Sequence, residues 1–212
     1  GDITLENEFL TAKIDGRSGM LLSLVDKTTG KEQLSAPAGL CVVDTEKATS
    51  NAWKIGRYLG VTPVDHTLCM EPISGNLRHG VRMEHQMLHS SVKTEVTLEE
   101  GARALKYSFS VDWSEAAAQS KTHPVLIYRM PLKDKAEQVL MDVPAGCAVR
   151  TARAMDLPGL SFAAALTGEK VPYIVTDCKY GYRLDRSELI ATLINTAGSP
   201  DPYPERGIHA IE

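Results

Sequence analysis

The stretch from Val92 to Trp113 constrains the fold more than any other part of this 212-residue chain, because apolar and polar residues alternate along it with a period of two. The alternation is interrupted once, at residues 99–101, where Gly101 permits a tight turn. On the second arm the apolar positions are Leu105, Tyr107, Phe109, Val111 and Trp113. Successive side chains of a strand point to opposite faces, so the pattern predicts a half-buried antiparallel hairpin with Trp113 in the core.

Period-two patterns recur along the rest of the chain, and 16 glycines and 11 prolines divide them into many short segments. Helical periodicity is confined to residues 114–121, which allow one or two turns. We therefore predict an all-β fold, a large antiparallel sandwich forming one domain over residues 1–212. The predicted irregular loops are residues 44–62, 151–159 and 198–207, and a strand is expected at 208–212.

Composition and charge exclude several classes of function. The formal net charge of −4 argues against nucleic acid as a partner. No run of apolar residues approaches the roughly 18 needed for a membrane span. The first residues lack the pattern of a signal peptide, which for a fragment says nothing about where the parent protein resides. The four cysteines are widely separated and form no Cys-x-x-Cys pair, so we expect reduced thiols, mostly buried, and a cytoplasmic location. They are Cys41, Cys69, Cys147 and Cys178.

The opening 34 residues read as short apolar strands separated by two glycine turns, Asp15–Gly19 and Asp26–Gly30. This pattern resembles the start of the C-terminal β domain of glycoside hydrolase family 38, the α-mannosidases. Further segments resemble that family in collinear order: residues 51–58, 110–115, 142–150, 173–182 and 200–202. Asn51 and Lys54 stand where the family usually has acids, and Ala145 replaces an aromatic residue.

The resemblance implies a β-supersandwich of the galactose-mutarotase-like kind, packed on an N-terminal catalytic barrel of the same polypeptide. Family members hydrolyse terminal α-linked mannose with retention of configuration, and a zinc ion whose ligands include a His-x-Asp pair holds the sugar. No histidine of this chain has an acid two residues later. We therefore expect no catalytic residue and no metal ligand within residues 1–212, and expect the zinc in the catalytic domain of the parent enzyme.

The family's β domain continues beyond the equivalent of Glu212, which would leave this chain truncated at its C-terminal end. An unpaired sheet edge created in that way would favour strand addition or a homo-oligomer. In relatives, a loop after the late strands projects towards the active-site cleft, and Arg206 occupies the comparable place here. A guanidinium fork can bind vicinal hydroxyls or orient a carboxylate, so Arg206 is a candidate substrate-proximal residue. The alternative for Arg206 is a hydrogen bond that braces its loop. Trp53, in the first predicted loop, is the second candidate.

Two other classes of function stay open at this point. A mutarotase-like sandwich can be a free-standing sugar mutarotase or epimerase, although no histidine and glutamate here have a spacing that specifies one. A carbohydrate-binding module would stack sugars on exposed aromatic rings. The candidates for that role are Trp53, Trp113, Tyr180 and Tyr182. Trp53 and Tyr182 are the freer of these, although core packing is the default for each.

Three histidines, His79, His85 and His89, suggest a metal site by their proximity in sequence. On a strand, His85 and His89 would share one face. The apolar residues around them favour structural histidines over zinc ligands, because zinc requires three or four ligands in near-ideal geometry.

Overall fold

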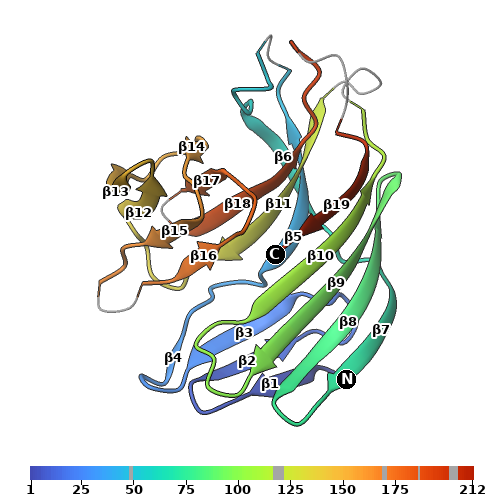
Figure 1. The fold of residues 1–212 in the computed structure, drawn as a ribbon, viewed down its shortest axis with the longest axis vertical. Coiled ribbons are helices and arrows are strands. Elements are labelled where there is room, and N and C mark those ends of the chain that lie inside the picture. Colours follow the sequence, from blue (N-terminus) through green and yellow to red (C-terminus); the bar gives the residue numbers. More distant parts are fainter. Residues whose placement is uncertain (48–49, 117–121, 169–170, 186, 201–204) are drawn as a thin grey trace.

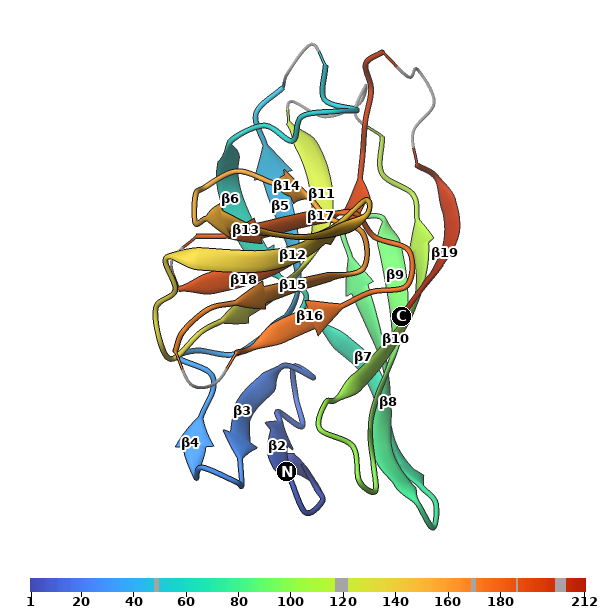
Figure 2. The same ribbon diagram turned by 60° about the vertical axis from the view of Figure 1, so that its left-hand side comes forward.

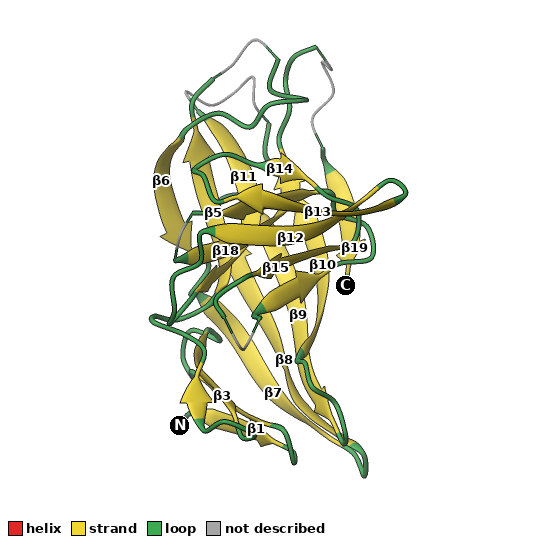
Figure 3. Ribbon diagram, turned by 90° about the vertical axis from the view of Figure 1, so that its left-hand side faces the viewer, coloured by secondary structure: helices red, strands yellow, loops and turns green. Residues whose placement is uncertain are grey.

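The computed structural model describes residues 1–47, 50–116, 122–168, 171–185, 187–200 and 205–212. Its regular structure within these ranges consists of 19 β-strands, and no described residue is helical. The strands form four antiparallel sheets (Figures 1 and 3). The prediction of an all-β antiparallel fold is confirmed. The helical turns expected at 114–121 fall largely on residues 117–121, outside the described residues.

The first sheet is formed by the N-terminal segment and lies at the bottom of Figure 1. Its strands, in spatial order, are β1 (Ile3–Glu6), β2 (Leu10–Ile14), β3 (Leu21–Asp26) and β4 (Lys31–Glu32). The two predicted glycine turns connect β2 to β3 and β3 to β4. In each turn the glycine amide donates to the first residue's carbonyl, Gly19 to Asp15 at 2.9 Å and Gly30 to Asp26 at 2.7 Å. Both glycines have positive φ, the conformation that glycine adopts at least cost.

The second sheet contains the predicted hairpin. Its strands, in spatial order, are β19 (Gly207–Ile211), β10 (Lys106–Trp113), β9 (Ser90–Glu99), β8 (Arg78–Met87) and β7 (Thr67–Ser74). Strands β9 and β10 pair around the turn, with Val96 opposite Tyr107. Val92, Val96 and Val111 are fully buried, as the alternation requires. The strand expected at 208–212 is confirmed as β19, which pairs with the second half of β10.

The third sheet has the largest number of strands and crosses the middle of the molecule (Figure 2). In spatial order it contains β14 (Leu157–Pro158), β17 (Gly181–Leu184), β18 (Glu188–Asn195), β11 (His123–Pro131), β5 (Gly39–Thr45) and β6 (Tyr58–Pro63). The fourth sheet contains β13 (Gly146–Thr151), β12 (Gln138–Val143), β15 (Phe162–Ala165) and β16 (Tyr173–Val175).

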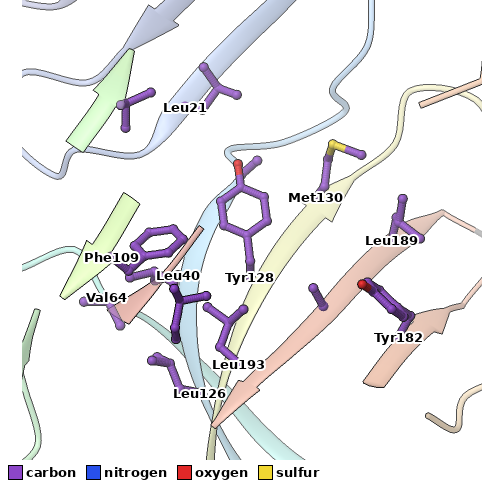
Figure 4. Close-up of a cluster of buried hydrophobic side chains, with 14 of the residues drawn as sticks. Leu21, Leu40, Val64, Phe109, Leu126, Tyr128, Met130, Tyr182, Leu189 and Leu193 are labelled. Carbon is purple, nitrogen blue, oxygen red and sulfur yellow. The ribbon is translucent and has the colours of Figure 1, made fainter. Parts of the chain in front are cut away.

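One hydrophobic cluster draws on all four sheets, through residues such as Ile14, Val111, Leu126 and Met141. Figure 4 shows part of it, where Leu40, Tyr128 and Leu193 of the third sheet lie near Phe109 of β10 and Leu21 of β3. The ring of Tyr128 packs edge-on against that of Tyr107, with 5.1 Å between the ring centroids. The sheets therefore share one interior.

The expectation that the cysteines are mostly buried is wrong for two of the four. All four thiols are free, but Cys69 and Cys147 are exposed. The reason is topological, since Cys69 lies on β7 and Cys147 on β13, each an edge strand of its sheet. Only Cys41, on β5 inside the third sheet, is fully buried, and burial raises the pKa of its thiol to about 11.

A buried asparagine fastens the N-terminal sheet to the β9–β10 hairpin. The Asn7 amide nitrogen donates to the carbonyls of Glu99 and Ala102, both at 2.8 Å. Its amide oxygen accepts from the backbone N–H groups of Phe9 and Leu10, both at 2.9 Å. The Arg103 guanidinium lies 3.7 Å above the Phe9 ring centroid and adds a second link.

We expect Asn7→Ala to lower the free energy of unfolding by about 2–4 kcal/mol, because it removes four hydrogen bonds to buried and partly buried backbone groups. Chemical denaturation measures the change. The matched control is Asn76→Ala, at an exposed position between β7 and β8, which should change stability by less than about 0.5 kcal/mol. Equal effects of the two substitutions would show that Asn7 is not the link.

Candidate functional site

The two predicted substrate-proximal residues belong to segments at one end of the sandwich. Trp53 lies in the loop between β5 and β6, and Arg206 lies just before β19. Figures 1 and 3 show the β5–β6 loop beside the segment that follows β18, at the top of the molecule. The sequence predicted irregular loops here, and the structure adds that the two segments are hydrogen-bonded to each other.

Asn51 is the centre of this arrangement. Its side-chain oxygen accepts from the amides of Gly198 and Ser199, at 3.2 and 3.0 Å. Its backbone carbonyl accepts from the Asn195 side chain at 2.8 Å, and its own amide nitrogen donates to Nδ1 of His123. We call these five residues the Asn51 junction. Asn51 is buried, so its bonds hold two loops together with little competition from water.

The junction rests on the strand ends of the third sheet and of the hairpin sheet. His123 begins β11, and its carbonyl accepts a hydrogen bond of 2.8 Å from Thr45 at the end of β5. Next to Asn195, the buried Thr196 hydroxyl accepts from the Trp113 indole at 3.0 Å. Trp113 is thus a core residue, as predicted, and its polar edge anchors the segment that leads towards Arg206.

The structure exposes both predicted residues. The amides of Trp53 and Lys54 donate to the Ser50 carbonyl at 3.1 and 3.0 Å, and this turn presents the Trp53 side chain with 77% of its surface exposed. Arg206 is also exposed. Residues 201–204 of its predicted loop lie outside the described residues. The junction therefore fixes the backbone beneath Trp53, whereas no described contact joins Trp53 to Arg206.

His123 is held in its neutral form. Burial, with a smaller contribution from the charge of Lys47, lowers the pKa of the imidazole below its ordinary value. The hydrogen bond from Asn51 requires the same state, because Nδ1 can accept from an amide only when it carries no proton. Asn51 was singled out in the sequence only as a replacement for an acid, and no local pattern indicated its link to residues 195–199.

The aromatic residues proposed for a sugar-binding face separate into two groups. Trp53 and Tyr180 are exposed, whereas Trp113 and Tyr182 are each only 1% exposed. Tyr182, which the sequence indicated was freer than Trp113 although core packing was the default for both, is as buried as Trp113. It lies on β17 inside the third sheet, and its hydroxyl donates to the Lys179 carbonyl at 3.1 Å and bonds Thr176 at 2.8 Å.

The histidines also differ from the predicted arrangement. His85 lies on β8 and is buried, but His89 lies in the turn after β8, exposed and 3.2 Å from a Glu115 oxygen. They do not share a strand face, because the strand ends at Met87. Within the described ranges, no group of three or more His, Cys, Asp or Glu side chains could hold a metal ion. The residues described therefore do not fit a zinc site.

A buried ion pair on the third sheet was missed in the sequence. Arg183 donates to Asp156 at 3.1 Å, and its guanidinium lies 3.6 Å from the Tyr58 ring centroid. Burial raises the pKa of Asp156, and the neighbouring Arg183 opposes that shift. The only feature of the sequence that could have indicated this ion pair is an arginine within the short, mostly apolar segment Gly181–Leu184. With its charge paired and its side chain covered, Arg183 supports the sheet and is inaccessible to a substrate.

An apolar groove of about 680 Å³ lies between the N-terminal sheet, the hairpin sheet, the third sheet and β16. Its walls include Leu24, Leu105, Tyr107, Tyr128, Ile174 and Leu193. Sugar-binding sites need polar groups that meet the hydroxyls. The lining of the groove is mainly apolar, so it does not resemble a catalytic cleft for a sugar. Charged residues such as Arg103 and Lys106 are also among its lining residues.

These features define a β-sandwich domain that presents one ordered loop end and, among the described residues, no metal-binding cluster. The chain belongs to the family described as glycosyl hydrolases family 38 C-terminal domain, whose model matches residues 5–203. The resemblance deduced from the glycine turns and later motifs is thereby confirmed.

Two comparisons with known proteins agree with this assignment. Human alpha-mannosidase 2C1 is 24% identical over 240 residues, covering 99% of this chain and 21% of the human protein. The crystal structure of an alpha-mannosidase from Enterococcus faecalis superposes with a TM-score of 0.80 at 15% identity, covering 98% of this chain and 28% of the other. The second comparison shows a shared fold. In both relatives the domain is part of a much longer polypeptide. No helix in the described ranges is long and apolar enough to cross a membrane.

The neutral state of His123 predicts how stability depends on pH. Since its folded pKa lies below the ordinary 6.5, its contribution is complete above pH 6.5 and is lost as the pH falls through the folded value. His85, whose pKa is also lowered by burial, acts in the same direction. We expect the thermal midpoint to fall on acidification below pH 6.5, and the His123 ring to titrate below 6.5 by NMR.

The control is Asn51→Asp, which places a carboxylate against the same ring nitrogen. A carboxylate accepts from a protonated Nδ1, so the pKa of His123 should rise in this variant. A His123 ring that titrates at or above 6.5 in the original chain would contradict the assignment.

Proposed function

We propose that this chain is the non-catalytic C-terminal β domain of a retaining α-mannosidase-type glycoside hydrolase, and that its ordered loop end forms part of the wall of the active-site cleft. The observation that carries the proposal is the family match over residues 5–203 combined with the Asn51 junction. The parent enzyme would hydrolyse terminal α-linked mannose. Its partner for this domain would be a catalytic barrel in the same polypeptide.

The catalytic chemistry is assigned to the rest of the parent. A retaining glycosidase needs two carboxyl groups about 5 Å apart, flanking the bond that is cleaved. Here the buried Glu115 accepts hydrogen bonds from Ser90 and the His89 amide, and the buried Asp156 is paired with Arg183. Both carboxylates therefore have structural hydrogen-bond partners within this domain. The zinc expected from the family resemblance would likewise be held outside residues 1–212.

Trp53 is the residue best suited to meet a sugar. Its ring is exposed, and its backbone is fixed by the turn at Ser50 and the Asn51 junction, so little loop entropy is lost when a ligand stacks on it. An aromatic face packs on the C–H surface of a pyranose, whereas the Arg206 guanidinium suits its hydroxyls. We propose both as substrate-proximal residues in the parent.

The four free thiols are compatible with a reducing compartment, since disulfides are rare in the cytosol. We therefore propose a cytoplasmic parent.

The test of the cleft-wall role is Trp53→Ala in the intact parent enzyme. We expect kcat/KM for an α-mannoside to fall about tenfold, equivalent to about 1.4 kcal/mol, with the thermal midpoint unchanged. Tyr180→Ala is the matched control, because Tyr180 is also exposed but lies between β16 and β17, outside the β5–β6 loop. Arg206→Ala should resemble Trp53→Ala. Unchanged kcat/KM in both loop variants would remove this end of the domain from the cleft.

Titration of the 212-residue chain with mannose, followed by NMR, separates the alternative functions. A domain that only supports the barrel should show neither saturable shifts nor faster exchange between anomers. Accelerated anomeric exchange would instead establish a mutarotase. Saturable shifts without exchange would establish a sugar-binding module, with Trp53 the first residue to replace.

The exposed sheet edges give a prediction about assembly. Strand β7 ends the hairpin sheet and carries the exposed Leu68, and β6 ends the third sheet and carries the exposed Leu59 and Val61. Apolar edge strands promote association. We expect the isolated chain to form dimers that dissociate on dilution. Light scattering that gives a monomer at about 100 µM would contradict this expectation.

A further inference from the structure

A small cavity lies where the N-terminal sheet, the hairpin sheet and the third sheet meet. Its volume is about 20 Å³, which is enough for one water molecule. Residues from all three sheets line it, among them Gly19, Leu40, His85, Thr94, Phe109 and Tyr128. Most of this lining is apolar, so any polar atom that faces the cavity matters to its stability.

Two buried polar atoms of the lining residues have no partner among the described residues, Nδ1 of His85 and Oγ1 of Thr94. The side chains are almost completely covered, since His85 is 4% exposed and Thr94 is 3% exposed. A buried polar atom without a hydrogen bond is unfavourable and uncommon in folded proteins. Two of them beside one cavity indicate a shared ligand.

The tautomer of His85 defines what that ligand must provide. Nε2 lies 3.0 Å from the Ser18 carbonyl, which can only accept, so Nε2 carries the proton. Burial lowers the pKa of the ring, which favours the neutral form. Nδ1 is therefore an acceptor and requires a donor. The Thr94 hydroxyl can either donate or accept.

The strand register places His85 and Thr94 close together on one face of the hairpin sheet. Thr94 on β9 pairs with Met83 on β8, and His85 pairs with Val92. His85 and Thr94 are thus diagonal neighbours on the same sheet face. Diagonal Cα atoms lie about 7–8 Å apart. The two side-chain atoms are not bonded to each other, so one intervening molecule could bridge them.

We propose that this cavity is a binding site for one structural water molecule, which donates a hydrogen bond to His85 Nδ1 and makes a second hydrogen bond with Thr94 Oγ1. The water would complete a chain of contacts from Thr94 through His85 to the Ser18 carbonyl in the β2–β3 turn. It would thereby link the hairpin sheet to the N-terminal sheet, two sheets whose described strands do not pair with each other.

The surroundings favour retention of such a water. A Cβ atom added at Gly19 would lie 2.8 Å from His85 Nε2 and 2.5 Å from the Met83 sulfur, so the β2–β3 turn packs closely over the ring. The other titratable groups that line the cavity are the phenols of Tyr107 and Tyr128, which stay neutral at physiological pH. Asp65 and His66 act on His85 electrostatically, with opposite effects on its pKa.

The substitution Thr94→Val tests the proposal, because the two possible states of the Thr94 hydroxyl predict opposite results. If the hydroxyl bonds to a bound water, its removal should lower the thermal midpoint by about 3 °C. If the hydroxyl is unpaired, replacement by an apolar side chain of the same shape should raise the midpoint, which would overturn the proposal.

Thr67→Val is the matched control. The Thr67 hydroxyl is also buried without a described partner, and Thr67 lies on the adjacent strand β7 opposite His85, but it does not line the cavity. We expect this variant to be unchanged or more stable. A crystal structure of the original chain at high resolution supplies a second measurement that needs no variant. Water density within 3.2 Å of both atoms supports the site, and an empty cavity overturns it.

Discussion

The packing of Tyr128 against Tyr107 and Phe109 is the contact on which the rest of the structure depends, because it joins the two largest sheets. Tyr128 lies on β11, near the middle of the third sheet, and Phe109 lies opposite it on β10 of the hairpin sheet (Figure 4). Tyr107 lies on the same strand, β10. No described strand of one sheet forms a ladder with a strand of another, but isolated backbone bridges join Leu21 to Ala38 and Leu34 to Leu132. Their relative positions therefore depend on these few backbone bridges and on side-chain packing, and the aromatic contact lies where the apolar interior is shared.

Polar side chains supplement this apolar contact at three places. Asn7 fastens the N-terminal sheet to the hairpin, His85 reaches the β2–β3 turn, and the Asn51 junction joins two loops at the other end. Each is a buried side chain that forms hydrogen bonds with backbone groups of a distant segment. Such groups are costly when unpaired, so these few residues determine how loops and sheets fit together.

The functional assignment depends on the distribution of these features. The charged residues with the deepest burial, such as Arg183, are paired in the sheet and cannot act on a substrate. Trp53 is an exposed aromatic residue in a loop that the junction holds in place. A domain with this arrangement can shape a surface for a neighbouring catalytic domain without contributing catalytic groups, as proposed for this family member.

The sequence by itself determined the all-β fold, the hairpin around Gly101, both N-terminal glycine turns, the buried Trp113 and the family, because period two and turn glycines act locally. Only the tertiary structure decided that Tyr182 is buried, that Cys69 and Cys147 are exposed, and that His85 and His89 are separated. It also placed Asn51 in contact with Asn195 and Ser199, which follow it in the sequence by 144 and 148 positions. Burial and long-range hydrogen bonds depend on which strands become edges and which loops meet, and local pattern carries no information about either.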